Sequence, residues 1–421
     1  MAAAGGGDAY VAKLAGLLGG WSGPTEPQLE ALAALLKAHS AESTALVAWL
    51  REDAAADAWL SRLTGPEAHR PQARLPWPYD TFAALHMQVL GALARGAPGD
   101  AYDHQEKLAL AFLHAMEEEE FTWSQTVMVA LFIDLRRLAV SADRALRAAG
   151  QKTHRCDQAA DKLRQGFSKV SNDKGKDLSV SKKWSALHLI NQIFKLLFSI
   201  NQLSVGLTNL QRWVDSPLCP NHTQPLERRG FPKSQVVTYQ YYSGRLALYE
   251  DDFETASRCL QWAFAHCHAS ATRNKQAILR FLVPVQLLIG RLPSSKLLQK
   301  HHLAEEYEDI VGAVRDGNVQ QFEIAMAEQY ERYARAVNAA SQYRCHCQRS
   351  RRRCCTRPPF LRRRPCPRCP DSLCLALCTG TLIGSSATVY ILCSRSCVRS
   401  SSATSSRRST CLLLRLRTSS S

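Results

Sequence analysis

The sequence predicts an all-α fold, a right-handed α-solenoid of stacked helical hairpins, on the strength of three observations. Apolar residues recur at helical spacing nearly throughout residues 1–340, as at Leu29, Leu32, Leu35 and Leu36. No alternating β pattern occurs in that region. Short breaks separate the helical stretches, and short connections make consecutive helices antiparallel neighbours that stack on one another.

The breaks between the predicted helices are rich in glycine, proline, asparagine and aspartate, the residues that end helices and form turns. They are Gly23-Pro24, Gly65-Pro66, Pro76-Trp77-Pro78, Gly96 to Gly99, Ser171 to Asp173 and the longer run from Asp215 to Pro232. We therefore expect helices to fill the intervals between these points.

The clearest predicted hairpin runs from Val236 to His268, with Asp251-Asp252 as its turn and helix N-cap. Gly244 and Ala256 are small where the two helices must approach closely, and Arg245 is expected to bridge helices rather than to meet a ligand. The two facing stripes comprise Tyr242, Leu246 and Tyr249 on the first helix and Phe253, Ala256, Leu260, Ala263, Phe264 and Cys267 on the second. This spacing is similar to that of a tetratricopeptide unit.

Charge and cysteine content divide the chain into two parts: residues 1–340, the body, are nearly neutral, and residues 341–421, the tail, are strongly basic. Residues 341–421 hold 16 arginines and a single acidic residue, Asp371, and so carry +15 of the formal net charge of +16. They also hold 11 of the 15 cysteines, and the few that remain in the body fit a reducing compartment. The tail has no helical period, so we interpret residues 336–421 as a disordered low-complexity segment.

The N-terminus lacks the basic start and apolar core of a signal peptide, and the first arginine is Arg51. We therefore expect a cytosolic or nuclear protein. The uncharged run from Ser372 to Ser394 is long enough to cross a bilayer, but its glycines, serines and threonines make insertion unfavourable, so no membrane insertion is expected.

Cysteine and histidine clusters raise the possibility of a metal site, which the spacing does not favour. In the tail, Cys366-x-x-Cys369 and Cys374-x-x-x-Cys378 are separated by only four residues, too few for a zinc loop. In the body, consecutive residues around Cys267 point in different directions on a helix. No phosphate-binding glycine loop, nucleophile elbow or HExxH motif occurs. We predict no catalytic residue, cofactor, metal or small-molecule substrate, which leaves a zinc-dependent enzyme as the disfavoured alternative class.

Five segments together resemble the PCI domain-containing protein 2 family. They are PWPYDTFAALHM (Pro76–Met87), ALFIDLRRLAVSAD (Ala130–Asp143), KKWSALHLINQIFKLLFSIN (Lys182–Asn201), VTYQYYSGRLALYEDDFETA (Val237–Ala256) and NKQAILRFLVPVQLLIGRLPSSKLL (Asn274–Leu298). The resemblance indicates a PCI-type helical-repeat domain over residues 76–335, preceded by a helical region over residues 1–75 that matches less well.

The resemblance implies a non-enzymatic scaffold or adaptor of a nuclear mRNA-export complex, transcription-export complex 2, which couples transcription to export at the nuclear pore. Its partners would be a large scaffold subunit, a small acidic disordered subunit and, as a further candidate, RNA or DNA. The family's C-terminal winged helix, part of its nucleic-acid platform, is missing here, because the chain continues after Ala336 into VNAASQYRCHCQRSRRRCC, a composition typical of out-of-frame translation. The runner-up is a subunit of another PCI assembly: the proteasome lid, the signalosome or a translation initiation factor.

Basic residues within these segments are candidates to bind an acidic peptide or a nucleic-acid backbone. They are Lys182, Lys183, Arg273, Lys275 and Arg280. Ordinary solvated helix faces show the same pattern, so both interpretations stay open.

Overall fold

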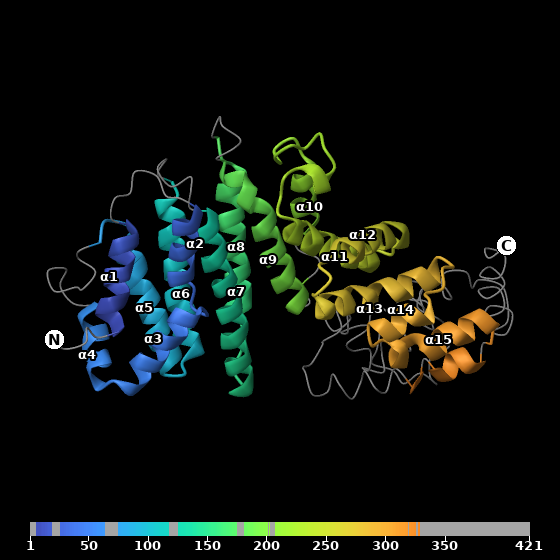
Figure 1. Cartoon of the computed structure of the whole chain (residues 1–421), viewed down its shortest axis with the longest axis horizontal. Coiled ribbons are helices and arrows are strands. Elements are labelled where there is room, and N and C mark those ends of the chain that lie inside the picture. Colours follow the sequence, from blue (N-terminus) through green and yellow to red (C-terminus); the bar gives the residue numbers. More distant parts are fainter. Residues whose placement is uncertain are drawn as a thin grey trace, which may run out of the picture. The chain divides into compact units, whose positions relative to one another are not determined.

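The structure is a computed structural model that describes part of the chain. The described residues are 6–18, 26–63, 75–117, 125–174, 181–200, 202, 207–318, 320–325 and 327–328. Within these ranges every regular element is a helix and none is a strand (Figure 1), so the predicted all-α helical repeat is confirmed. The residues expected to form the disordered tail, their cysteines and the position at which a winged helix would be expected lie outside the described residues.

Contacts divide the chain into two compact units, which meet in the sequence between Gln235 and Val236. The helices of the first unit are α1 (Gly6–Leu18), α2 (Glu26–Leu35), α3 (Ala41–Glu52), α4 (Ala54–Leu63), α5 (Tyr79–Ala94), α6 (Pro98–Ala115), α7 (Gln125–Ala148), α8 (Arg155–Ser171), the 3-10 turn η5 (Lys182–Ser185), α9 (Ala186–Ser199), α10 (Leu207–Asp215) and the 3-10 turn η6 (Leu226–Arg228). From α5 to α9, each α-helix packs against the next (Figure 1), as the short connections predict.

Helix ends coincide with the predicted breaks wherever these are described. Pro76-Trp77-Pro78 directly precedes α5, and the Trp77–Pro78 peptide is cis. Gly96 takes a left-handed φ of 68° after the end of α5, a conformation that glycine adopts without strain. Pro98 is the first residue of α6, where its missing N–H removes no helical hydrogen bond. The breaks at Gly23-Pro24 and Gly65-Pro66 lie outside the described residues.

The N-terminal helices belong to the core of the first unit. Helix α2 packs against α7, and α3 packs against α5. Of the predicted apolar stripe, Leu32, Leu35 and Leu36 are buried, which confirms the side of α2 that faces inward. Helices α2 and α3, which lie in the weakly matched N-terminal region, thus dock on the helical repeat through ordinary hydrophobic burial.

The second unit contains α11 (Lys233–Tyr249), which begins just before the boundary, and then α12 (Phe253–His266), α13 (Thr272–Leu288), α14 (Ser295–Lys300) and α15 (Ala304–Asp316). Its core comes mainly from buried leucine, isoleucine and valine side chains of α12, α13 and α15. Asp252 caps α12, because its side chain accepts a hydrogen bond from the Thr255 N–H at 3.1 Å.

Of the predicted apolar stripe on α11, Tyr242 is only half-buried and Tyr249 is exposed. Leu246 is buried, but the side chain of Tyr249 is 53% exposed. Tyr249 is the last residue of the helix, and the chain turns directly after it through Asp251, whose φ is +62°. Burial on α11 instead continues through Ala247 and Leu248.

Candidate partner-binding surfaces

Lys182 and Lys183 lie on η5 in the first unit, where Lys182 is engaged within the protein. Its ammonium group donates a hydrogen bond to the carbonyl oxygen of Met116, just beyond the end of α6, and so compensates the negative end of that helix. Its backbone N–H donates to Asp173 at 3.0 Å. Lys182 therefore joins α6 to η5, and only part of either lysine is open to a partner.

The three basic candidates of the second unit lie on α13 and have different surroundings. Arg280 forms a two-pronged ion pair with Glu306 of α15, at 2.7 and 3.2 Å. The Lys275 ammonium lies 5.2 Å from the centroid of the Phe264 ring, a cation–π contact. Arg273 is exposed in the first turn and makes no ion pair with any other described residue. Of the three candidates on α13, Arg273 is therefore the one whose charge is most open to a partner.

The hairpin residues Gly244, Ala256 and Arg245 occupy the contacts between helices. A Cβ atom on Gly244 would lie 2.7 Å from Cγ of Leu260 and 3.3 Å from the carbonyl oxygen of Ala256, so α11 and α12 touch at this point. The Arg245 guanidinium lies over three rings, at 4.5 Å from the centroid of Phe281 on α13, 5.5 Å from Tyr241 and 5.6 Å from Tyr242. The guanidinium thereby links α11 to α13. Phe253 is buried at the start of α12.

Sequence reasoning missed a groove along the outer face of α12, which we call the α12 groove. It has a volume of about 680 Å³ and is lined by Glu254, Ser257, Arg258, Gln261, Trp262, Ala265, His266, Ile289 and Arg291. The spacing of Glu254, Arg258, Trp262 and His266 at steps of four is the signal that could have indicated it, because such residues share one face of a helix.

The described histidines and cysteines of the second unit do not gather into a metal site. His266 stacks on Trp262, with ring centroids 4.0 Å apart, while the buried Cys267 lies at the end of α12. His301 packs edge-on against Phe264, and burial lowers its pKa. Within the described part of the chain, no three His, Cys, Asp or Glu side chains lie close enough together to hold a metal ion.

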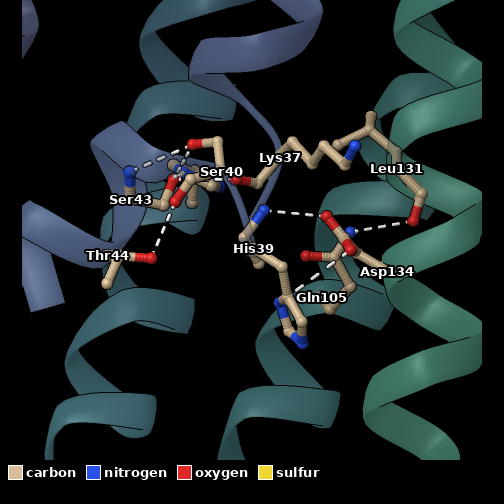
Figure 2. A network of polar contacts seen from close by, with 10 residues as sticks. Lys37, His39, Ser40, Ser43, Thr44, Gln105, Leu131 and Asp134 are labelled. Atoms are coloured by element: carbon tan, nitrogen blue, oxygen red, sulfur yellow. Dashed lines mark hydrogen bonds and ion pairs between the residues drawn. The ribbon is translucent and has the colours of Figure 1, made fainter.

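A buried polar network in the first unit was also missed (Figure 2). The carboxylate of Asp134 on α7 is fully buried and accepts a hydrogen bond from the backbone N–H of Ala38 at 2.7 Å. Figure 2 shows Gln105 of α6 beside it, donating to the carbonyl oxygen of Leu131 at 3.0 Å. Ser43 donates to the carbonyl oxygen of Lys37 at 2.7 Å. These bonds join the connection between α2 and α3 to α7, and they join α6 to α7.

Among the described helices, none has the length and apolar character needed to cross a membrane. The described fold is a repeat of packed α-helices whose outward faces carry an open groove and charged side chains. These features define an α-helical repeat protein.

Comparison with known proteins identifies relatives of this helical repeat protein. No family model matches the chain. It is 34% identical over 261 residues to PCI domain-containing protein 2 of Danio rerio, and 32% identical over 261 residues to the protein of that name from Xenopus laevis. Both alignments cover 61% of this chain and 63% of the relative. A further relative, Protein CSN12 homolog of Mycosarcoma maydis, is 31% identical over 247 residues, which are 54% of this chain and 52% of the relative.

Over the aligned residues, the chain is similar to PCI domain-containing protein 2, the family that its motifs resemble. The alignments span less than two thirds of the length of these relatives.

Proposed function

We propose that this chain is a non-enzymatic scaffold subunit of a nuclear mRNA-export complex and couples transcription to export at the nuclear pore. The observation that carries the proposal is the similarity to proteins named PCI domain-containing protein 2, at 34% identity over 261 residues, on an all-α repeat. Stacked helical hairpins suit this role, because each hairpin contributes a strip to one long surface on which other chains can lie.

The proposed partners are a large scaffold subunit and a small acidic, disordered subunit. An acidic segment requires exposed cations whose charges are not already paired. On α13, Arg273 meets that requirement, since it is exposed and forms no ion pair with another described residue. Lys182 and Arg280 already form bonds with other groups of this chain, so we expect them to contribute less to partner binding.

Co-expression of the full chain with the large and the small acidic subunits of its own species tests the proposal. We expect the three chains to co-elute in size-exclusion chromatography with a mass that corresponds to one copy of each. Separate elution of this chain would contradict the proposal. A stable association with subunits of the proteasome lid, the signalosome or a translation initiation factor would favour the runner-up assembly instead.

Charge reversal tests where the acidic subunit binds. We expect Arg273→Glu to weaken its binding several-fold, while Arg144→Glu, at an exposed arginine on α7 in the other unit, leaves it unchanged. If both variants bind the acidic subunit equally well, that subunit does not bind at α13. The proposed assembly with the large subunit would not be affected by this result.

A further inference from the structure

The α12 groove is positively charged. Arg258 and Arg291 line it, and neither forms an ion pair with another described residue. Glu254 is the single carboxylate among its lining residues, so the formal net charge of the lining is positive. A concave surface with unpaired arginines concentrates anions.

The position of Arg291 is fixed by the backbone at the end of α13. Gly290 takes a left-handed φ of 84°, and the N–H of Arg291 donates to the carbonyl oxygen of Gln286 at 2.8 Å, which closes the helix. This turn places Arg291 and Ile289 beside α12, where both residues line the groove. The two arginines therefore reach the groove from different elements.

A flat aromatic surface lies between these charges. The rings of Trp262 and His266 are nearly parallel, with an interplanar angle of 15°. Nδ1 of His266 lies 2.9 Å from the carbonyl oxygen of Trp262, and because a carbonyl oxygen only accepts, Nδ1 carries the hydrogen. The stacked pair is thereby held in one orientation, with both rings lining the groove.

The floor of the groove holds its polar side chains in place. The buried hydroxyl oxygen of Ser257 lies 3.1 Å from Nε2 of Gln261 and 3.1 Å from Nε2 of Gln286, and it accepts a hydrogen bond from each amide. The Gln261 amide, which lines the groove, is thus oriented next to Trp262.

We propose that the α12 groove binds single-stranded RNA, with a base stacked on the Trp262–His266 pair and the adjoining phosphates held by Arg258 and Arg291. Proteins that bind single strands combine an aromatic platform with a positively charged track in this way. The volume of about 680 Å³ lies within the range for sites that hold one nucleotide-sized ligand. An acidic peptide would use the arginines but has no group that needs the aromatic pair. This site goes beyond the proposed scaffold role.

Photo-cross-linking of the full chain to an oligouridine of about 12 nucleotides that contains 4-thiouridine tests the proposal. The arginine-rich residues 341–421 will bind RNA through charge alone, so the position of each cross-link must be mapped by mass spectrometry. We expect cross-links in α12 and at residues 289–291, with slower amide hydrogen exchange of the same peptides when RNA is present.

Two variants and one control identify the side chains that bind RNA in the α12 groove. Trp262→Leu retains apolar bulk but removes the stacking surface, and we expect the α12 cross-link yield to fall about fivefold or more. We expect the double variant Arg258→Gln with Arg291→Gln to cause a similar loss that persists at physiological salt. Arg315→Gln, at an exposed arginine on α15 that does not line the groove, is the matched control and leaves the yield unchanged.

Each outcome decides the proposal. The same protection of α12 by uridine monophosphate alone would support the site and identify a free nucleotide as its ligand. The proposal would be overturned if RNA gave neither protection nor cross-links in α12, or if all variants gave equal cross-link yields. It would also be overturned if a polyglutamate peptide protected α12 and RNA did not. The groove variants should still co-elute with the large subunit, so failure here is distinguishable from failure of the scaffold assignment.

Discussion

The side-chain carboxylate of Asp134 accepts a hydrogen bond from the backbone N–H of Ala38 at 2.7 Å and so joins α7 to the connection between α2 and α3. Its second oxygen lies 4.0 Å from Nδ1 of His39, which is partly exposed. Burial raises the pKa of Asp134, and the Ala38 hydrogen bond and the nearby cationic side chains oppose that rise. A buried acid thus helps to hold the N-terminal helices on the repeat.

We expect Asp134→Ala to lower the free energy of unfolding by about 2 kcal/mol, because the Ala38 N–H loses its acceptor inside the protein. Asp134→Asn keeps an oxygen acceptor and should lose less. Urea denaturation followed by circular dichroism measures both, with Asp309→Ala at an exposed position of α15 as the control. An equal effect of Asp134→Ala and the control variant would show that the buried bond contributes nothing to stability.

Buried His86 predicts a pH dependence of stability. Its Nε2 lies 3.4 Å from the Ser43 hydroxyl oxygen, its ring stacks on Tyr10, and burial lowers its pKa from 6.5 to about 3. Between these values the unfolded chain binds a proton that the folded chain does not, so stability falls as the pH falls through this window.

The test compares the wild-type chain with His86→Gln at pH 7 and pH 5. We expect the wild-type free energy of unfolding to fall by about 2 kcal/mol more than that of the variant over this interval. Urea denaturation at the two pH values measures the difference. Parallel loss in both proteins would mean that His86 does not stay neutral in the folded state.

Gly244 predicts the effect of one added methyl group. The Cβ of Gly244→Ala would meet Leu260 at 2.7 Å, so we expect a loss of about 1 kcal/mol even after alanine's better helix propensity is included. In a Leu260→Ala background the same change should no longer destabilise. Gly312→Ala on α15, where a Cβ meets nothing within 4 Å, should stabilise the protein by about 0.5–1 kcal/mol. Equal effects of the two glycine substitutions on the melting temperature would contradict this close contact.

The ion pair between Arg280 and Glu306 should contribute little to stability, because the Arg280 side chain is 52% exposed. We expect a double-mutant cycle of Arg280→Gln and Glu306→Gln to give a coupling of about 1 kcal/mol or less that weakens as salt is added. Thermal denaturation at low and high salt measures the coupling. A larger, salt-independent value would show that the pair is structurally essential.

Local sequence patterns predict the helices of this protein better than they predict its sites. Pro76-Trp77-Pro78 marks the start of α5, and Asp252 caps α12 as its sequence position indicates. Such features depend on neighbours within a few residues. The bond from Ala38 to Asp134 joins positions 96 residues apart, and Arg291 reaches the α12 groove only after the chain has folded back along α13. Spacing along one helix carries no information about such contacts.

The central claim, a role in mRNA export, is tested most directly by the distribution of polyadenylated RNA in cells depleted of this chain. Fluorescence in situ hybridisation should show this RNA accumulating in the nucleus, and re-expression of the chain should restore its normal distribution. An unchanged distribution after complete depletion would contradict the account.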